Sequence, residues 1–220
     1  MSRKIATIFA AAFALLVGSQ CALAEDNLFK GYAYNSPLEN YAVTKGYYDC
    51  SEDIGGTARC IDNVDFVGQK FSAALVFSAG KLIIVTLVSP SDQDVYTKAS
   101  AALSKSFTVV SMTDDKTILD LIDLAATAKN KDEYISKFSN FENVGLGAGN
   151  LTYTFLEGVK VKSSLRNASS MLAAAPDNTR SAELIVSGKG ADALLLVRFT
   201  FPKLEAKKSL EAAQEPAESF

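Results

Sequence analysis

The chain has 220 residues, of which 22 are basic and 25 acidic, and it contains neither histidine nor tryptophan. Its net charge of −3 lacks the basic excess that binding to a phosphate backbone requires, so we expect no nucleic-acid partner. Without histidine there is no imidazole for Ser-His-Asp or Cys-His catalysis or for most catalytic zinc sites. Carboxylate pairs, lysine nucleophiles and calcium sites stay open.

The first 24 residues have the three parts of a secretory signal peptide. Arg3 and Lys4 are basic, residues 5–17 form an apolar run, and small residues precede an acidic start at Glu25. The apolar run is too short for a membrane span, which needs roughly 20 helical residues. We therefore predict cleavage after Ala24 and export of a bacterial protein to the periplasm or the medium. The processed chain keeps 20 basic and 25 acidic residues and has no transmembrane segment.

Residues 25–48 form a tyrosine-rich segment with turns expected at Pro37 and Gly46. Each aromatic ring offers apolar area and, in tyrosine, a polar tip, so this segment is a candidate binding surface. The alternative is that the rings cover one edge of a sheet. The rings belong to Phe29, Tyr32, Tyr34, Tyr41, Tyr47 and Tyr48.

Two cysteines, Cys50 and Cys60, remain after Cys21 leaves with the signal peptide. Disulfides persist in the oxidising compartments that exported chains enter, and Gly55 and Gly56 between the two cysteines allow the chain to reverse. We predict a disulfide. A redox pair is disfavoured because nine residues intervene, and a metal site because histidine is absent, so no cofactor and no metal is expected.

Five carboxylates lie near the two cysteines in the sequence. They lack the alternating ligands and the closing glutamate of an EF-hand loop, so a solvated acidic edge is favoured over a calcium site. The five are Asp49, Glu52, Asp53, Asp62 and Asp65.

Residues 72–77 and 82–88 are predicted to be two strands joined by a tight turn. The second run is apolar at almost every position, which is typical of a strand buried on both faces or packed beneath a helix. A helix is expected over about 94–106, and a short strand over 107–112. The candidate core contacts of this helix are Val95, Ala99, Ala102, Leu103 and Phe107.

The acidic start of the next segment predicts a helix that places Ile118, Leu121, Ile122 and Ala125 on one face. A second helix is expected over about 131–139, with Tyr134, Ile135 and Phe138 facing inward. The glycines of the GLGAGN stretch are expected to end that pattern.

Residues 150–165 alternate between apolar and polar, which predicts a β-hairpin with its turn near Glu157 and Gly158. Further elements are a short helix over 166–175 and two strands on either side of a glycine loop at 188–190. A helix over 203–214 is expected to follow Pro202.

The fold class is predicted to be α+β, with antiparallel sheets and packed helices. The hairpins at 72–90 and 181–202 are alike, which a tandem duplication of a strand-hairpin-helix unit explains, as does convergence of two ordinary hairpins. The predicted division is the segment 25–48, one half at 49–142, a second half at 150–214, and a loose tail at 215–220. One continuous domain over 25–214 is the alternative.

No motif for catalysis has its required context, so we expect a non-enzymatic binding or inhibitor-type protein. Its partner would be another envelope or secreted protein, bound through the sheet face or the tyrosine-rich segment. One alternative is a hydrolase of envelope glycans, which needs two carboxylates, such as Asp62, Asp65 or Glu157, about 5 to 10 Å apart. The other is a carrier of a small apolar ligand, which needs a closed apolar cavity of a few hundred Å³.

Overall fold

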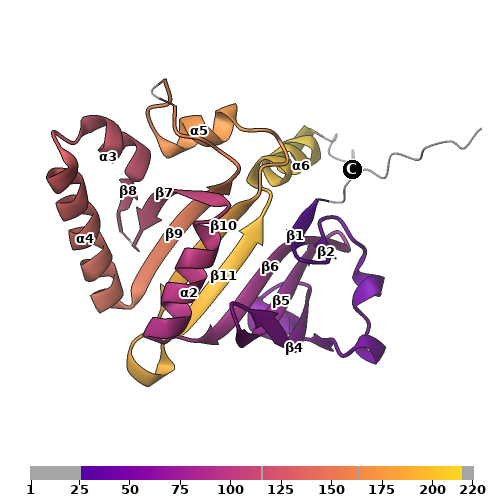
Figure 1. The fold of residues 1–220 in the computed structure, drawn as a ribbon. Helices are drawn as coiled ribbons and strands as arrows, with labels where there is room; N and C mark the ends of the chain where they lie inside the picture. Colours follow the sequence, from indigo (N-terminus) through magenta and orange to yellow (C-terminus); the bar gives the residue numbers. More distant parts are fainter. Residues whose placement is uncertain (1–25, 115, 163, 215–220) are drawn as a thin grey trace, which may run out of the picture.

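Nine strands form one antiparallel sheet in a computed structural model of the chain, which describes residues 26–114, 116–162 and 164–214 (Figure 1). A small two-stranded sheet and six α-helices accompany it over these residues. The prediction of an α+β fold with antiparallel pairing is therefore confirmed. The predicted signal peptide and the predicted loose tail lie outside the described residues.

The order of strands in the large sheet is β3-β4-β5-β6-β11-β10-β9-β7-β8. In that order their bounds are Tyr48–Asp49, Ala58–Phe66, Gln69–Ser78, Lys81–Pro90, Leu194–Thr200, Ser181–Ser187, Asn150–Glu157, Phe107–Thr113 and Ile118–Asp120. The small sheet pairs β1 (Asn27–Phe29) with β2 (Tyr32–Ala33). The helices are α1 (Ser51–Ile54), α2 (Gln93–Leu103), α3 (Leu121–Thr127), α4 (Lys131–Ala148), α5 (Ala168–Ala174) and α6 (Pro202–Gln214).

Two three-stranded meanders meet at the centre of this sheet. The first runs β4-β5-β6 and is followed by α2, and the second runs β9-β10-β11 and is followed by α6. They join where β6 pairs with β11, from Leu194 opposite Pro90 to Phe199 opposite Val85. Strand β7 lies outside β9, and β8 forms the far edge.

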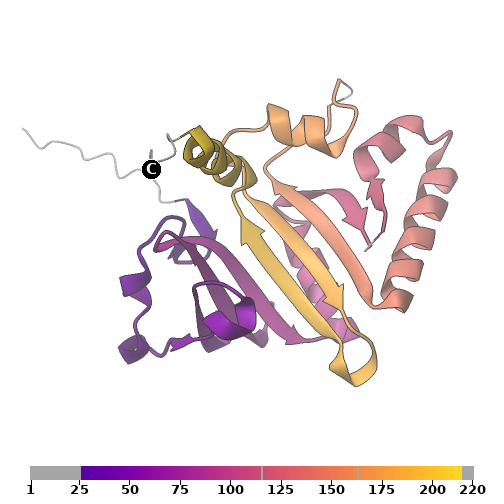
Figure 2. The same ribbon diagram turned by 180° about the vertical axis from the view of Figure 1, so that it is seen from behind.

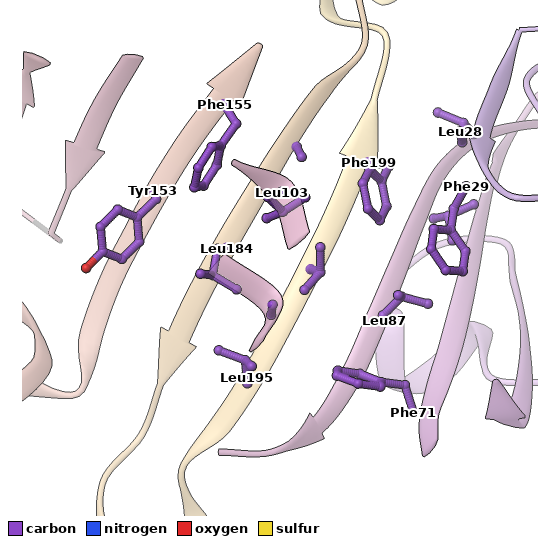
Figure 3. Packing of buried hydrophobic residues seen from close by; sticks show 14 of the residues in the cluster. Leu28, Phe29, Phe71, Leu87, Leu103, Tyr153, Phe155, Leu184, Leu195 and Phe199 are labelled. Atoms are coloured by element: carbon purple, nitrogen blue, oxygen red, sulfur yellow. The ribbon is translucent and has the colours of Figure 1, made fainter. Parts of the chain in front are cut away.

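One face of the sheet carries the main hydrophobic core. Because successive side chains of a strand point to opposite faces, Leu184, Leu195 and Val197 all point toward this face. Helix α2 packs onto it with Val95, Ala99 and Leu103, the last of which is labelled in Figure 3. Of the two other predicted core residues, Phe107 is partly buried against the core and Ala102 is only partly buried. Asp92 caps the first turn of α2. Each fully buried Leu or Val side chain contributes about 1.5 to 3 kcal/mol.

The N-terminal segment covers the same face toward the β4 side of the sheet. The Phe29 ring stacks on Phe199 at 5.3 Å, and Leu28 is fully buried (Figure 3). Tyr41 lies 5.5 Å from the Phe77 ring between centroids. Aromatic rings therefore close the part of the core that α2 does not reach.

Most elements that local sequence signals predict are present. The two predicted hairpins are β5-β6 and β10-β11, and the predicted strand at 107–112 is β7. The short helix before Pro176 is α5, and the C-terminal helix is α6. Pro202 is the first residue of α6, where its missing N–H has no helical partner to lose.

The helix predicted to begin at the acidic residues around 114 begins later. Asp120 caps α3 by accepting hydrogen bonds from the backbone of Ile122 and Asp123. Ile118 belongs instead to β8 and is 72% exposed, and Leu124 rather than Ala125 is buried. The prediction is wrong here because β7 offers an edge that β8 fills, a tertiary pairing that overrides the local helix signal.

The glycines of the GLGAGN stretch do not end the helix where the sequence predicts. Helix α4 continues through Gly145 and Gly147 and ends at Gly149, which has φ +68°. Tyr134 and Phe138 pack against the core as predicted, whereas Ile135 is 46% exposed. Gly145 lies within the helix and close to Leu151. The position therefore leaves no room for a larger side chain.

The hairpin predicted over residues 150–165 is also absent. Strand β9 takes up the first half, but its two edges pair with β10 and β7. No edge of β9 is left for a second local strand, and residues 159–162 and 164–167 belong to no helix or strand. The alternating pattern is real, but it does not reveal which strand becomes the neighbour.

We expect Gly149→Ala and Gly147→Ala to change stability in opposite directions. A Cβ at Gly149 would lie 2.3 Å from the Gly188 carbonyl oxygen, and the positive φ adds strain, so unfolding free energy should fall by about 2 kcal/mol or more. A Cβ at Gly147 meets nothing within 4 Å and should raise stability by roughly 0.5 to 1 kcal/mol through helix propensity. Urea unfolding of both variants tests this, and equal losses would contradict the structure.

Candidate functional site

The second face of the sheet is open over its central strands. Cross-strand partners point to the same face, so the register places Val88, Leu196 and Ile185 in one row, and Thr86, Arg198 and Glu183 in the next. Helix α2 lies behind these strands when this face is viewed from the front (Figure 2). We call the surface of these six residues the open face.

The open face combines one apolar row with one polar row, and all six of its residues are partly exposed. Val88, Leu196 and Ile185 are all partly exposed, and Leu194, at the edge of the face, is 41% exposed. The run 82–88 predicts a strand buried on both faces or packed beneath a helix, and in the structure its burial alternates. Val85 and Leu87 lie in the core that also contains the buried residues of α2, whereas Thr86 and Val88 lie on the open face. The sequence therefore supplies more apolar side chains to this strand than the fold buries.

An ion pair lies at the centre of the open face. Arg198 Nε donates a hydrogen bond to Glu183 Oε2 at 2.6 Å, and the two residues are directly opposite each other on β11 and β10. Their side chains are 41% and 28% exposed. The pair cancels the net charge of the face and holds both side chains across the strands, which leaves a polar centre within an apolar surface.

The disulfide forms one rim of the open face. Cys60 lies opposite Ala74, which continues the row of Thr86, and Tyr48 lies opposite Cys60 at the sheet edge. Cys60 is bonded to Cys50 with Cα atoms 5.9 Å apart, as the sequence predicts, and the pair is buried with Ala58 and Ala74. Tyr48 is 45% exposed at this rim.

A second small core forms the opposite rim. Leu156 follows Thr154 and Thr152 on the open side of β9 and is buried with Val110, Ile122 and Met171. Ile122 belongs to α3 and Met171 to α5, so these two short helices cover the β9–β7 end. The open face lies between this rim and the disulfide.

Three of the acidic residues near the disulfide accept hydrogen bonds from, or form ion pairs with, neighbouring groups. Hydrogen bonds from Ser51 hold the pKa of Asp49 below its usual value, and Arg59 adds an ion pair. Lys70 lowers the pKa of Asp65 in the same way. Asp62 accepts a hydrogen bond from Ser72 Oγ at 2.6 Å. Across residues 26–114, 116–162 and 164–214, no group of His, Cys, Asp or Glu has the arrangement of a metal site.

The tyrosine-rich segment divides between the core and the surface. Phe29 and Tyr41 are 6% exposed, and Tyr32, Tyr34 and Tyr47 are partly buried against the main core. Their faces are engaged in ring contacts within the fold, such as the edge contact of Tyr41 with Tyr47. Among the six aromatic residues singled out in the sequence, Tyr48 alone reaches the rim of the open face.

Of the three carboxylates considered for glycan hydrolysis, Glu157 lies apart from Asp62 and Asp65. Asp62 and Asp65 lie on β4, whereas Glu157 ends β9, with four strands between the two. Glu157 accepts two hydrogen bonds from Arg180, at 3.0 and 2.6 Å. The sheet thus separates these residues and gives them different partners.

Several surface hollows are present, and their walls are not purely apolar. One of about 590 Å³ between the β5-β6 turn and α6 includes Lys81, Glu205 and Lys208. Another of about 420 Å³ beside α3 includes Lys162 and Arg166. Neither is the closed apolar cavity that a ligand carrier is expected to have.

A tyrosine–carboxylate cluster joins α2, α4 and β9, and the sequence gives no signal for it. The Tyr96 and Tyr153 hydroxyl oxygens lie 2.6 Å apart, and both lie within hydrogen-bond distance of Glu142 Oε1 of α4. Because each hydroxyl carries one proton, two of these three contacts are hydrogen bonds at any one time. Burial raises the pKa of Tyr96 to about 12 and raises that of Tyr153 further. The cluster fastens α4 to the core and has a structural role in this arrangement.

No protein-family model, curated protein or solved structure matches this chain. The role of each surface is therefore inferred from its own residues.

Removing the disulfide with Cys50→Ala and Cys60→Ala should lower the free energy of unfolding by roughly 3 kcal/mol, because the unfolded chain regains the entropy of a short closed loop. Urea unfolding of the double variant and the parent gives the difference. Thiol titration of the denatured, unreduced parent should find no free thiol in the processed chain. Two free thiols would contradict the bond.

Stability should fall between about pH 10 and pH 12, because Tyr96 and Tyr153 bind their protons more tightly in the folded chain. Their contribution is complete below the unfolded pKa of about 10 and is lost as pH rises through the folded value. The absorbance of tyrosinate as a function of pH measures the ionisation of the tyrosines. The urea midpoint at each pH measures the stability. Full ionisation of all tyrosines near pH 10 in folded protein would refute the assignment.

Proposed function

We propose that this chain is an exported, non-enzymatic protein that binds another envelope or secreted protein through the open face. The observation that carries the proposal is the apolar row of Val88, Leu196 and Ile185 near the centre of the sheet, which none of the described helices covers (Figure 2). Contiguous exposed apolar surface with a polar rim is typical of a protein interaction site.

The shape and chemistry of the open face favour a protein partner over a small molecule. The face is a broad pleated surface, whereas small-ligand sites are concave and enclose most of the ligand. Its ion pair supplies a fixed polar centre, and Tyr48 at the rim adds a ring with a hydroxyl tip, a residue type enriched at interfaces. An inhibitor that presents a rigid sheet to its target is one form of this function.

The location is part of the proposal. The Cys50–Cys60 disulfide is consistent with an oxidising compartment, in which such bonds persist. Over the described ranges no helix has the length and apolarity of a membrane span. Together with the predicted signal peptide, the disulfide supports a periplasmic or secreted chain.

The strand order also supports the proposal that the chain arose by tandem duplication. The order β4-β5-β6 followed by β11-β10-β9 reads the same from either end, and a helix follows each meander. The insertion of β7, β8, α3 and α4 then separates the two units. In this proposal the open face is built by both units about their common seam.

A photo-crosslinking amino acid at Leu196 should yield a discrete adduct with an envelope protein in the native host, whereas the same group at Leu210 should not. Leu210 is the matched control because it is 64% exposed but lies on α6, away from the open face. Adding Ile185→Glu should abolish the Leu196 adduct, since a charge beside it opposes burial in an apolar interface. Adducts of equal yield at both positions, or none at Leu196, would reject the proposal.

A further inference from the structure

The connection between β9 and α5 is fixed to the fold at both ends. Gly158 donates its N–H to the Ser106 carbonyl at 3.1 Å, and Thr108 Oγ donates to the Val159 carbonyl at 2.9 Å. At the other end, the N–H of Ala168 donates to Asp120 Oδ2 at 2.8 Å. Residues 159–162 and 164–167 between these anchors lie beside α3 and α5 (Figure 1).

Side chains of this connection divide into an inner and an outer set. Val159 and Leu165 pack against the small core of the β9–β7 end. Val161 is 57% exposed. Lys160, Lys162 and Arg166 are also exposed, and we call these three with Val161 the cationic loop.

The three cations of the cationic loop have no acidic partner among the described residues. Other basic side chains do, as Lys70 pairs with Asp65 and Lys98 with Asp94. Lys160, Lys162 and Arg166 form no such pair within 26–114, 116–162 and 164–214. The loop thus places three cations without an ion pair to a described residue within seven positions of a chain whose net charge is −3.

Two hollows flank the cationic loop, and both include Lys162 and Leu165. One of about 420 Å³ has Ile122 and Ala125 of α3 in its wall, and the other of about 270 Å³ has Met171 of α5. Cationic and apolar groups therefore share the same surface, with an exposed valine between the cations. This combination fits an interface between anionic headgroups and hydrocarbon.

We propose that the cationic loop attaches the chain to a membrane surface rich in anionic lipid. The inference is independent of the proposed protein-binding function, because it uses none of the residues of the open face. Charge complementarity selects the membrane, and the exposed Val161 and the flanking hollows add apolar contact. Three cations in an acidic chain are too few for a nucleic-acid backbone.

Sedimentation with vesicles tests this attachment. The processed chain should bind vesicles of phosphatidylcholine with about one third phosphatidylglycerol, and not vesicles of phosphatidylcholine alone, and high salt should release it. Lys160→Ser, Lys162→Ser and Arg166→Ser combined should lower the partition coefficient about 100-fold, since each cation beside an anionic surface contributes roughly fivefold. Val161→Ser should weaken binding by a smaller factor.

A charge-matched control separates the loop from a general effect of net charge. Lys45→Ser, Lys81→Ser and Lys207→Ser combined remove the same charge from three exposed lysines outside the loop and should leave binding nearly unchanged. Thermal unfolding of each variant confirms that it is folded. Equal losses in the two triple variants, or no preference of the parent for anionic vesicles, would overturn the proposal.

Discussion

The pairing of β6 with β11 is the interaction on which the rest of the structure depends. It joins two meanders that are about a hundred residues apart in the chain, from Leu194 opposite Pro90 to Phe199 opposite Val85. Such a contact closes a long loop, which lowers the conformational entropy of the chain. It therefore forms only if the free energy gained by burying apolar surface exceeds this entropic cost. Val85 and Leu87 of β6 and Leu195 and Val197 of β11 supply this surface at the seam, beneath the layer that contains α2.

The same pairing also creates the open face. A slip of one residue in the β6–β11 register would turn Leu195 and Val197 away from the core, so the register is fixed by burial. Once those side chains face α2, the intervening Leu196 must face the other way. The short helices α3 and α5 cover the second face only at its β9–β7 end, as the small core around Leu156 shows. The partial exposure of Val88, Leu196 and Ile185 thus follows from the core itself.

Local signals in the sequence predict the hairpins, α2 and the disulfide, because each depends on residues close together in the chain. Asp92 caps α2, and Cys50 and Cys60 are the two cysteines that cleavage of the predicted signal peptide would leave. Errors arise where a distant element decides. The sequence of β9 does not show that β7 and β10 occupy both its edges, and Ile118 gives no sign that it extends β7 rather than α3.

The candidate surfaces are less predictable than the fold, because they depend on which parts of a sheet face no helix covers. The apolar run of β6 predicts burial on both sides, and only the arrangement of all helices shows that one side is open. The tyrosine-rich segment does not form the candidate surface, because distant strands bury some of its rings. Its rings were a candidate surface, but Phe29 and Tyr41 have partners in distant strands, Phe199 and Phe77. Of that set, Tyr48 has a position that serves the proposed interface.

The two ends of the sheet differ in the charged residues that they carry. The acidic residues Asp62 and Asp65 lie on β4, whereas the cationic loop follows β9, five strand spacings away and therefore roughly 24 Å across the sheet. This distance is several times the Debye length of about 8 Å at physiological salt, so repulsion from the acidic end hardly weakens attraction at the loop. A chain attached through the cationic loop would keep its disulfide end, with Tyr48, away from the lipid. Much of the open face between the two ends would then stay accessible to a protein partner, which makes the two proposed contacts compatible.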